Sequence, residues 1–426
     1  MAKPKLALIP AAQGSKLFSV LPSSGVGDFD FTRSGSATRI NSQGLIEEVA
    51  NGQSRLNYPM IDGKVVGCPH HILEPARTNL LSYSEDFSQS YWTKTDSNVT
   101  SNSVISPDGT LNADKLVENT QNTAHIAFAS PTITLGNNTF SVFAKAAERR
   151  VLGIEFPSNG ILVSFDLIDG VFVNQQANPD NFSITPFLNG WYRIDITENL
   201  TSNSVVALSL RDENGNRTYQ GDGTSGVYIW GAMLEQGSFQ TSYIPTNGST
   251  VTRAAETANG SGDAATFNDS EGVLMANISF NLEDNYPNLS IFNNTNSTKT
   301  DNKIVIYKGA SNSNQISVAL RSGASEYANI TANVNVESYN KIVISYKANE
   351  VKYYLNGFLI GTDNTVTVPI GLDTLNFDNG AGANDVYGKT KQIQYFDTAL
   401  TDSELEQLTS WTSFTDMAQG QLYTIE

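Results

Sequence analysis

Residues Asn340–Thr362 read NKIVISYKANEVKYYLNGFLIGT, and this stretch decides the fold class. Apolar side chains alternate with others in residues 342–346 and again in residues 351–355. A period of two is typical of β-strands with one buried face. The second run ends at Asn356-Gly357, and both residue types tolerate the positive φ angles that a type I′ turn requires. The stretch therefore predicts two strands, the second of which forms a tight hairpin with residues 358–360.

A short helix is predicted further along, in the segment ALTDSELEQL at residues 399–408. Thr401 can cap its N-terminus while Glu404 reaches back to the cap, and Leu405 and Leu408 form its apolar side. A Tyr-x-x-Asn-Gly-type hairpin followed by such a helix resembles the laminin-G-like, concanavalin A-type jelly rolls. The resemblance implies a β-sandwich and a binding role, because that family consists mostly of binding modules.

Strand patterns fill most of the remaining chain, so we expect an all-β protein with two tandem jelly-roll β-sandwiches, in residues 81–247 and 265–416. The first of these resembles carbohydrate-binding modules at the level of the fold. Residues 248–264 are rich in Gly, Ser, Thr and Ala and are predicted to be a linker, and 417–426 a C-terminal tail. Residues 1–80 have too few apolar side chains for a core of their own. They are predicted to be an irregular docking region that folds against a partner or a neighbouring domain.

Composition and charge narrow the classes of function. Acidic residues exceed basic ones by 17 and only 16% of residues are charged, which argues against a nucleic-acid groove. The single cysteine, Cys68, excludes an intramolecular disulfide framework. The apolar run Leu6–Pro10 is too short for a signal peptide, and no apolar run approaches the ~20 residues of a membrane span. The chain is therefore expected to be made in a cytoplasm without membrane insertion.

Five segments carry a second resemblance: DFDFTRSGSATRI (28–40), LEPARTNLL (73–81), WGAMLE (230–235), SYIPT (242–246) and VTRA (251–254). As a set they resemble structural proteins of phages that infect Bacteroidota. The resemblance implies a virion protein, assembled in the host cytoplasm and exposed on the particle exterior, in a tail fibre, head fibre or capsid decoration. Because residues 1–80 have little core of their own and a charge balance that differs from the rest of the chain, they are predicted to contact other virion proteins. Phage fibres are commonly homotrimers.

Candidate catalytic chemistry is sparse, so we expect no enzyme activity. Cys68-Pro69-His70-His71 offers three soft ligands, but a zinc site needs a fourth and usually wider spacing, and a plain loop is the simpler interpretation. Concanavalin A-type hydrolases carry Glu-x-Asp-x-Glu on one strand, and that pattern is absent here. Asp402, Glu404 and Glu406 come nearest, but they lie in the predicted helix and are expected to form a solvated face.

The segment Asp378–Gly388 is the candidate rim loop for ligand binding, because lectin-type sandwiches bind ligands through loops that are free of the core. Its oxygen-bearing side chains suit sugar hydroxyls or a calcium ion, for which Asp378 and Asp385 are the candidate ligands. A plain loop between strands is the alternative. Trp191 and Trp230 are expected in the core, whereas Tyr91-Trp92 and Tyr286 either stack on a sugar or pack inside. The predicted glycan-binding residues are Asp378, Asn379, Asn384, Asp385 and Tyr387.

The sequence thus predicts a phage virion appendage that adheres to host-surface or environmental glycans. No cofactor is required, calcium is an option, and a homotrimer is one option for assembly. The leading alternative is a purely structural head-fibre, collar or capsid-stabilising protein whose lectin-like domains bind other virion proteins. A polysaccharide-depolymerising tailspike is the second alternative.

Overall fold

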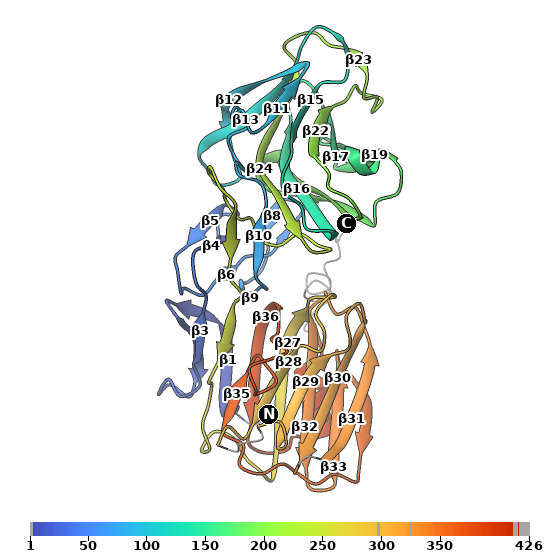
Figure 1. The fold of residues 1–426 in the computed structure, drawn as a ribbon. Helices are drawn as coiled ribbons and strands as arrows, with labels where there is room; N and C mark the ends of the chain where they lie inside the picture. Colours follow the sequence, from blue (N-terminus) through green and yellow to red (C-terminus); the bar gives the residue numbers. More distant parts are fainter. Residues whose placement is uncertain (1–2, 296–298, 324, 412–415, 417–426) are drawn as a thin grey trace.

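The computed structural model describes residues 3–295, 299–323, 325–411 and 416, and its strands gather in two stacked β-sandwiches (Figure 1). The all-β prediction is confirmed, and the predicted tail 417–426 lies outside the described residues. No helix in the described part of the chain is long and apolar enough to cross a membrane.

The larger sheet of the lower sandwich has eleven strands and contains segments from both ends of the chain. Two of its strands, β9 (His70–Leu73) and β6 (Leu56–Asn57), lie off the main path, where β9 pairs with both β36 and β6. The main path runs in the order β26 (Thr257–Asn259), β3 (Phe29–Thr32), β2 (Lys16–Leu21), β1 (Leu6–Gln13), β36 (Gly388–Phe396), β27 (Glu271–Phe280), β32 (Asn340–Lys347), β33 (Glu350–Leu355) and β34 (Phe358–Asp363).

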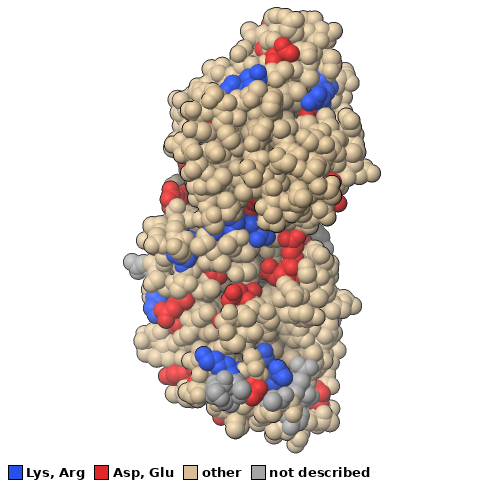
Figure 2. All heavy atoms as spheres, viewed as in Figure 1, with Lys and Arg blue, Asp and Glu red and all other residues tan. Residues whose placement is uncertain are grey.

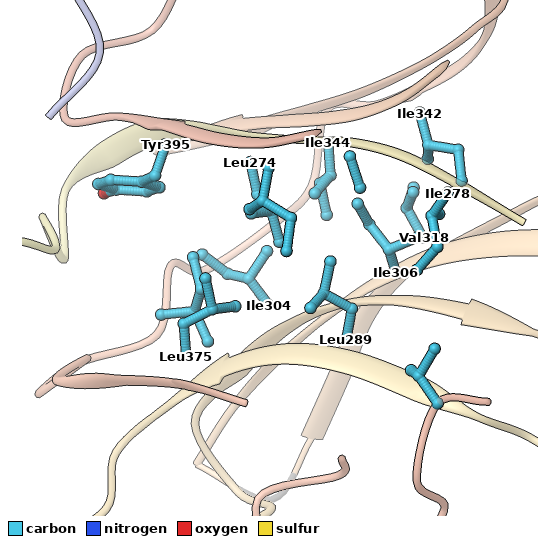
Figure 3. Packing of buried hydrophobic residues seen from close by; sticks show 14 of the residues in the cluster. Leu274, Ile278, Leu289, Ile304, Ile306, Val318, Ile342, Ile344, Leu375 and Tyr395 are labelled. Carbon is cyan, nitrogen blue, oxygen red and sulfur yellow. The ribbon is translucent and has the colours of Figure 1, made fainter. Parts of the chain in front are cut away.

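A five-stranded sheet faces it, and the two sheets enclose one core. Leu274 and Ile344 extend from the larger sheet toward Leu289 and Ile304 of the smaller one (Figure 3). The smaller sheet runs in the order β31 (Ser325–Asn333), β30 (Gln315–Ser322), β29 (Lys303–Lys308), β28 (Asn288–Phe292) and β35 (Thr374–Asn376).

The predicted hairpin and helix are both confirmed. Asn356 and Gly357 have φ angles of 50° and 91°, and they connect β33 to β34 with Leu355 opposite Phe358. Helix α1 spans Asp402–Thr409, and its N-terminal residue pair Thr401 and Glu404 forms a capping box. The helix buries Leu405 in a small cluster on the outer face of the larger sheet.

The upper sandwich contains two six-stranded antiparallel sheets around a second core. Trp191 and Trp230 are buried as predicted, and Trp92 is buried too. One sheet runs β11 (Thr93–Thr95), β15 (Ile126–Ala129), β22 (Val206–Leu210), β17 (Val151–Phe156), β18 (Ile161–Asp166), β19 (Val171–Gln176). The other runs β12 (Ser97–Ile105), β13 (Leu111–Glu118), β24 (Gly226–Gln236), β16 (Gly136–Ala146), β21 (Tyr192–Leu200), β20 (Asn181–Pro186).

Short pairs and single turns complete the fold. The two 3-10 helices of the described chain, η1 (Pro157–Asn159) and η2 (Leu188–Gly190), lie in connections of the upper sandwich. The two-stranded pairs are β10 (Arg77–Asn79) with β25 (Val251–Arg253), β14 (Asn122–Thr123) with β23 (Tyr219–Gln220), β4 (Ala37–Ile40) with β5 (Ile46–Val49), and β7 (Met60–Ile61) with β8 (Lys64–Val65).

The N-terminal region differs from the irregular segment that we expected. It forms β1 to β10, and β1 pairs with β36 so that Leu6 lies opposite Tyr395 and Leu8 opposite Ile393. Its apolar side chains, too few for a separate core, instead enter the core of the lower sandwich. These residues are Leu6, Leu8, Leu17, Phe29 and Phe31.

The predicted linker 248–264 is also structured. It contributes β25, which pairs with β10, and β26, which pairs with β3. The polar composition of this segment suggested a linker, but two of its polar residues, Arg253 and Glu256, are buried. They form ion pairs with residues elsewhere in the chain.

Candidate functional site

Asp378, the first residue of the predicted rim loop, is turned into the protein. Its side chain is 1% exposed, and its carboxylate accepts hydrogen bonds from the Gly380 backbone NH at 2.6 Å and from the Asn259 and Asn376 side-chain amides at 3.1 and 3.2 Å. These bonds fix the start of the loop to the ends of β35 and β26. Asp378 therefore holds the loop in place rather than presenting oxygens to a ligand.

The calcium prediction does not fit this arrangement. Calcium takes six to eight oxygen ligands. Here the Asp378 carboxylate oxygens already accept hydrogen bonds from NH groups of the protein. The described residues contain no group of three or more His, Cys, Asp or Glu suited to a metal. Burial and the nearby charge of Asp378 raise the pKa of Asp385, while a bond from Tyr387 opposes that rise. Asp385 is half-buried near Asp378.

The other loop residues divide between structural and exposed positions. The Asn379 side-chain oxygen accepts from the Ala381 backbone NH at 2.8 Å and shapes the turn. Tyr387 is half-buried and packs against the core, and burial raises its pKa to about 12. Asn384 is exposed, with a positive φ of 58°, and it is the one member of the predicted set that reaches a surface groove.

That groove lies on the outer face of the five-stranded sheet. It has a volume of about 160 Å³, and Asn384 borders it together with Tyr286 and Tyr307. Tyr286 is 45% exposed, and its ring centroid lies 6.5 Å from that of Tyr307. Lys303 and Arg321 also line the groove. Two aromatic faces beside amide and cationic groups are the elements that bind the apolar face and the hydroxyls of a sugar.

Strand alternation explains why these side chains share one face. On β29 the core residues Ile304 and Ile306 alternate with Lys303 and Tyr307, which point to the other side. Arg321 lies opposite Lys303 on β30. The sequence analysis identified Tyr286 and Asn384 but missed Tyr307, Lys303 and Arg321, although the same period of two contained the signal.

Segments that carry the phage resemblance meet at a buried charge cluster, which we define as Arg33, Arg55, Glu74, Arg253 and Glu256. Arg55 Nε donates to Glu256 Oε1 at 2.8 Å, and Arg55 Nη2 donates to Glu74 Oε2 at 2.8 Å. Arg33 Nη1 reaches Glu256 Oε1 at 2.8 Å, and Arg253 Nη1 lies 2.9 Å from Glu74 Oε2. All five are buried, so the cluster ties the N-terminal region to the segment after the upper sandwich.

The electrostatics of this cluster suit a structural role. Burial alone would raise the pKa of Glu74, but the charges of Arg253 and Arg55 outweigh it and hold the pKa far below its ordinary value. The Ser242 backbone NH also donates to Glu74 Oε1 at 2.9 Å. In Figure 2 charged residues lie at the waist between the sandwiches, and others lie near the top of the upper sandwich and over the lower one.

The histidines of Cys68-Pro69-His70-His71 do not lie in the plain loop that we expected. His70 and His71 begin β9 and are buried, whereas Cys68 is exposed. Burial lowers the pKa of both imidazoles, and for His70 the charges of Lys389 and Lys391 lower it further.

Comparisons with known proteins support the C-terminal assignment. Residues 259–406 match the model of the concanavalin A-like lectin/glucanases superfamily. No curated protein matches the chain significantly. The CBM40 of Ruminococcus gnavus IT-sialidase, bound to α2,3 sialyllactose, is 21% identical, with a TM-score of 0.30, over 35% of this chain and 93% of its own.

Two further solved structures are similar over about a third of this chain. The heptameric SAP-like pentraxin from Limulus polyphemus is 15% identical, with a TM-score of 0.26, over 34% of this chain and 71% of its own. The leech intramolecular trans-sialidase is 21% identical, with a TM-score of 0.28, over 34% of this chain and 24% of its own. The family match, which covers the hairpin and most of the capped helix, shows that the C-terminal domain is laminin-G/concanavalin A-like.

Proposed function

We propose that this protein is an adhesin whose C-terminal domain binds glycans at the Tyr286–Tyr307 groove. The observation that carries the proposal is the pair of exposed Tyr286 and half-buried Tyr307 beside Asn384, on the outer face of a lectin-type sheet. A shallow groove of this kind binds weakly, and millimolar affinity, about −4 kcal/mol, is the expected scale for one site.

The test is glycan-array binding followed by titration of any ligand found. The variant Tyr286→Ala/Tyr307→Ala is expected to lose binding, because each substitution removes a stacking face. Phe172→Ala is the matched control, since Phe172 is a similarly exposed aromatic residue, stacked on Phe182 in the upper sandwich. Binding of a neutral glycan that survives in the double variant, or that disappears in the control, would contradict the assignment to this groove.

We further propose that the protein is a non-catalytic component of a phage virion, assembled in the host cytoplasm and carried on the particle exterior. The support is the set of phage-like segments, which includes Arg33, Glu74 and Arg253 of the buried charge cluster. Residues 1–80 remain the proposed attachment to other virion proteins, through surfaces outside the shared sheet. Mass spectrometry of purified particles tests this placement, and release of reducing ends from host polysaccharide would overturn the non-catalytic assignment.

A further inference from the structure

A pocket of about 460 Å³ lies where the N-terminal region, the upper sandwich and the lower sandwich meet. Its volume is within the range of small-molecule sites, about 300–1,000 Å³. β4, β6 and β9 supply one wall, β16 and β21 another, and Lys389 of β36 borders it from the lower sandwich. It shares no lining residue with the Tyr286–Tyr307 groove.

Lys389 is the feature of this pocket that requires an explanation. Lys389 is half-buried, and among the residues that the structure describes its Nζ has no hydrogen-bond or ion-pair partner. Burial lowers its pKa, although the charges of Glu74 and Glu337 oppose that shift. Another lysine of the same sandwich, Lys308, is fully engaged, since its Nζ donates to the carbonyls of Asp284 and Ala310 at 2.6 and 2.8 Å. A desolvated cation without a partner costs free energy, so such groups concentrate at binding sites.

Other polar atoms of the pocket also lack partners among the described residues. They are His70 Nδ1, Gln240 Oε1 and Arg193 Nε, all shielded from solvent. Buried polar atoms in native proteins are nearly always hydrogen-bonded. Gln240 Oε1 can only accept, whereas Arg193 Nε can only donate, so a group that fills the pocket must do both. Hydroxyl groups meet that requirement.

The acidic side chain that borders the pocket does not neutralise Lys389. The Glu74 carboxylate belongs to the buried charge cluster and is paired with Arg55 and Arg253. The neighbouring cation Arg39 is paired in turn with Glu47. The rest of the lining mixes polar residues with apolar ones, and the apolar ones include Met60 and Phe187. Among the described residues the pocket thus combines the unpaired Lys389 cation, unsatisfied acceptors and donors, and apolar side chains.

We propose that this pocket binds a carboxylate-bearing sugar residue. The carboxylate pairs with Lys389 Nζ, hydroxyls bond to Gln240 and His70, and one ring face packs against Met60 and Phe187. The site is separate from the surface groove and does not depend on the groove's binding glycan.

Isothermal titration of the full chain with a galacturonic acid disaccharide, and with the neutral galactose disaccharide, tests the proposal. The acidic sugar is expected to bind and the neutral one to bind at least ten-fold more weakly, because a charge-assisted hydrogen bond contributes on the order of ten-fold in affinity. Lys389→Met is expected to weaken binding of the acidic sugar by about the same factor. Lys347→Met, which removes an equal charge from an exposed lysine paired with Glu350, is the control and should bind like wild type.

Two readouts separate binding from a structural role. Lys389→Met should melt at the same temperature as wild type or higher, because it removes a half-buried, unpaired charge. The groove variant Tyr286→Ala/Tyr307→Ala should retain binding of the acidic sugar. Failure of wild type to bind it, equal binding by Lys389→Met, a lowered melting temperature of that variant, or loss of binding in the groove variant would each overturn the proposal.

Discussion

Glu256 shows how much one buried charge decides in this molecule. Its carboxylate accepts hydrogen bonds from the Arg33 and Arg55 guanidinium groups. It also accepts one from the Glu74 backbone NH at 2.9 Å. Removing one member of a buried ion pair leaves uncompensated charges in a medium that solvates them poorly. Glu256→Gln is therefore expected to lower the free energy of unfolding by about 3–5 kcal/mol, measured by urea denaturation.

Glu47→Gln is the control for this substitution. Glu47 pairs with Arg39 near the surface, where an ion pair contributes roughly 0–1 kcal/mol. Equal effects of the two substitutions would show that the buried charge cluster does not hold the regions together.

Asp284 provides a pH-dependent test. Burial raises its pKa to about 7, and the charges of Lys308 and Arg77 reduce that rise only in part. Because the folded-state pKa lies above the unfolded one, the neutral form is favoured by folding. The contribution to stability is complete below about pH 4 and is lost as the pH rises through about 7. Asp284→Asn should therefore unfold at higher urea than wild type at pH 8, with a much smaller difference at pH 4. No pH dependence of that difference would contradict this assignment.

Among single residues, the sequence analysis identified only some of those that line the candidate groove. Tyr286 and Asn384 were found because aromatic and amide residues in loops suggest sugar contacts. Whether Asp378 faces solvent or the interior depends on Asn259, which is distant in sequence, and no local pattern encodes that contact. The side of the sheet on which Tyr307 lies follows from alternation, but its pairing with Tyr286 depends on a loop conformation.

Among the elements, β1 allows a direct test of how burial contributes to the free energy of unfolding. Leu8 is completely buried in the core of the lower sandwich, whereas its neighbour Ile9 is 44% exposed. Leu8→Ala is expected to lower the free energy of unfolding by about 2–5 kcal/mol, because it removes buried methyl groups and leaves a cavity. Ile9→Ala should change it by about 0.5 kcal/mol or less. Similar effects of the two substitutions would mean that β1 is not part of the folded sheet.

The elements also show what sequence reasoning can and cannot reach. The hairpin at Asn356-Gly357 and the box at Thr401–Glu404 are set by residues within a few positions of one another, and both were predicted. β1 lies near the start of the described chain and β36 near its end. No sequence pattern within either strand indicates that the two pair. The pairing of strands that are far apart in the sequence is therefore invisible to local patterns.

At the scale of the whole molecule, the N-terminal region cannot be removed without damage. The prediction of a separate docking region in residues 1–80 implies that a chain starting at Asn79 folds as a soluble unit. The structure predicts the opposite for the lower sandwich, because the truncation removes β1, β2 and β3 and the core residues they carry. Such a chain should show one cooperative transition from the upper sandwich only, by calorimetry and limited proteolysis. Two intact transitions would contradict the shared sheet.

Assembly is a second question at this scale. A homotrimer was one option for assembly in the sequence analysis, and the edge strand β34 exposes Phe358 and Leu359 at 73% and 50%. Apolar edge strands favour self-association. Light scattering at micromolar concentration should give three times the protomer mass, and Phe358→Lys should reduce it. A monomeric mass for the unsubstituted chain would exclude the trimer.

The pairing of β10 with β25 has a consequence for how this chain can be rearranged. Asn79 enters the upper sandwich directly opposite Val251, which leaves it, so the whole sandwich is an insertion whose two attachment points are neighbours across one ladder. Opposed residues of an antiparallel pair lie about 5 Å apart, a gap that a turn of a few residues closes. The upper sandwich is thus inserted in the manner of a cassette, with both attachment points in one ladder, while β1 and β36 pair in the sheet below.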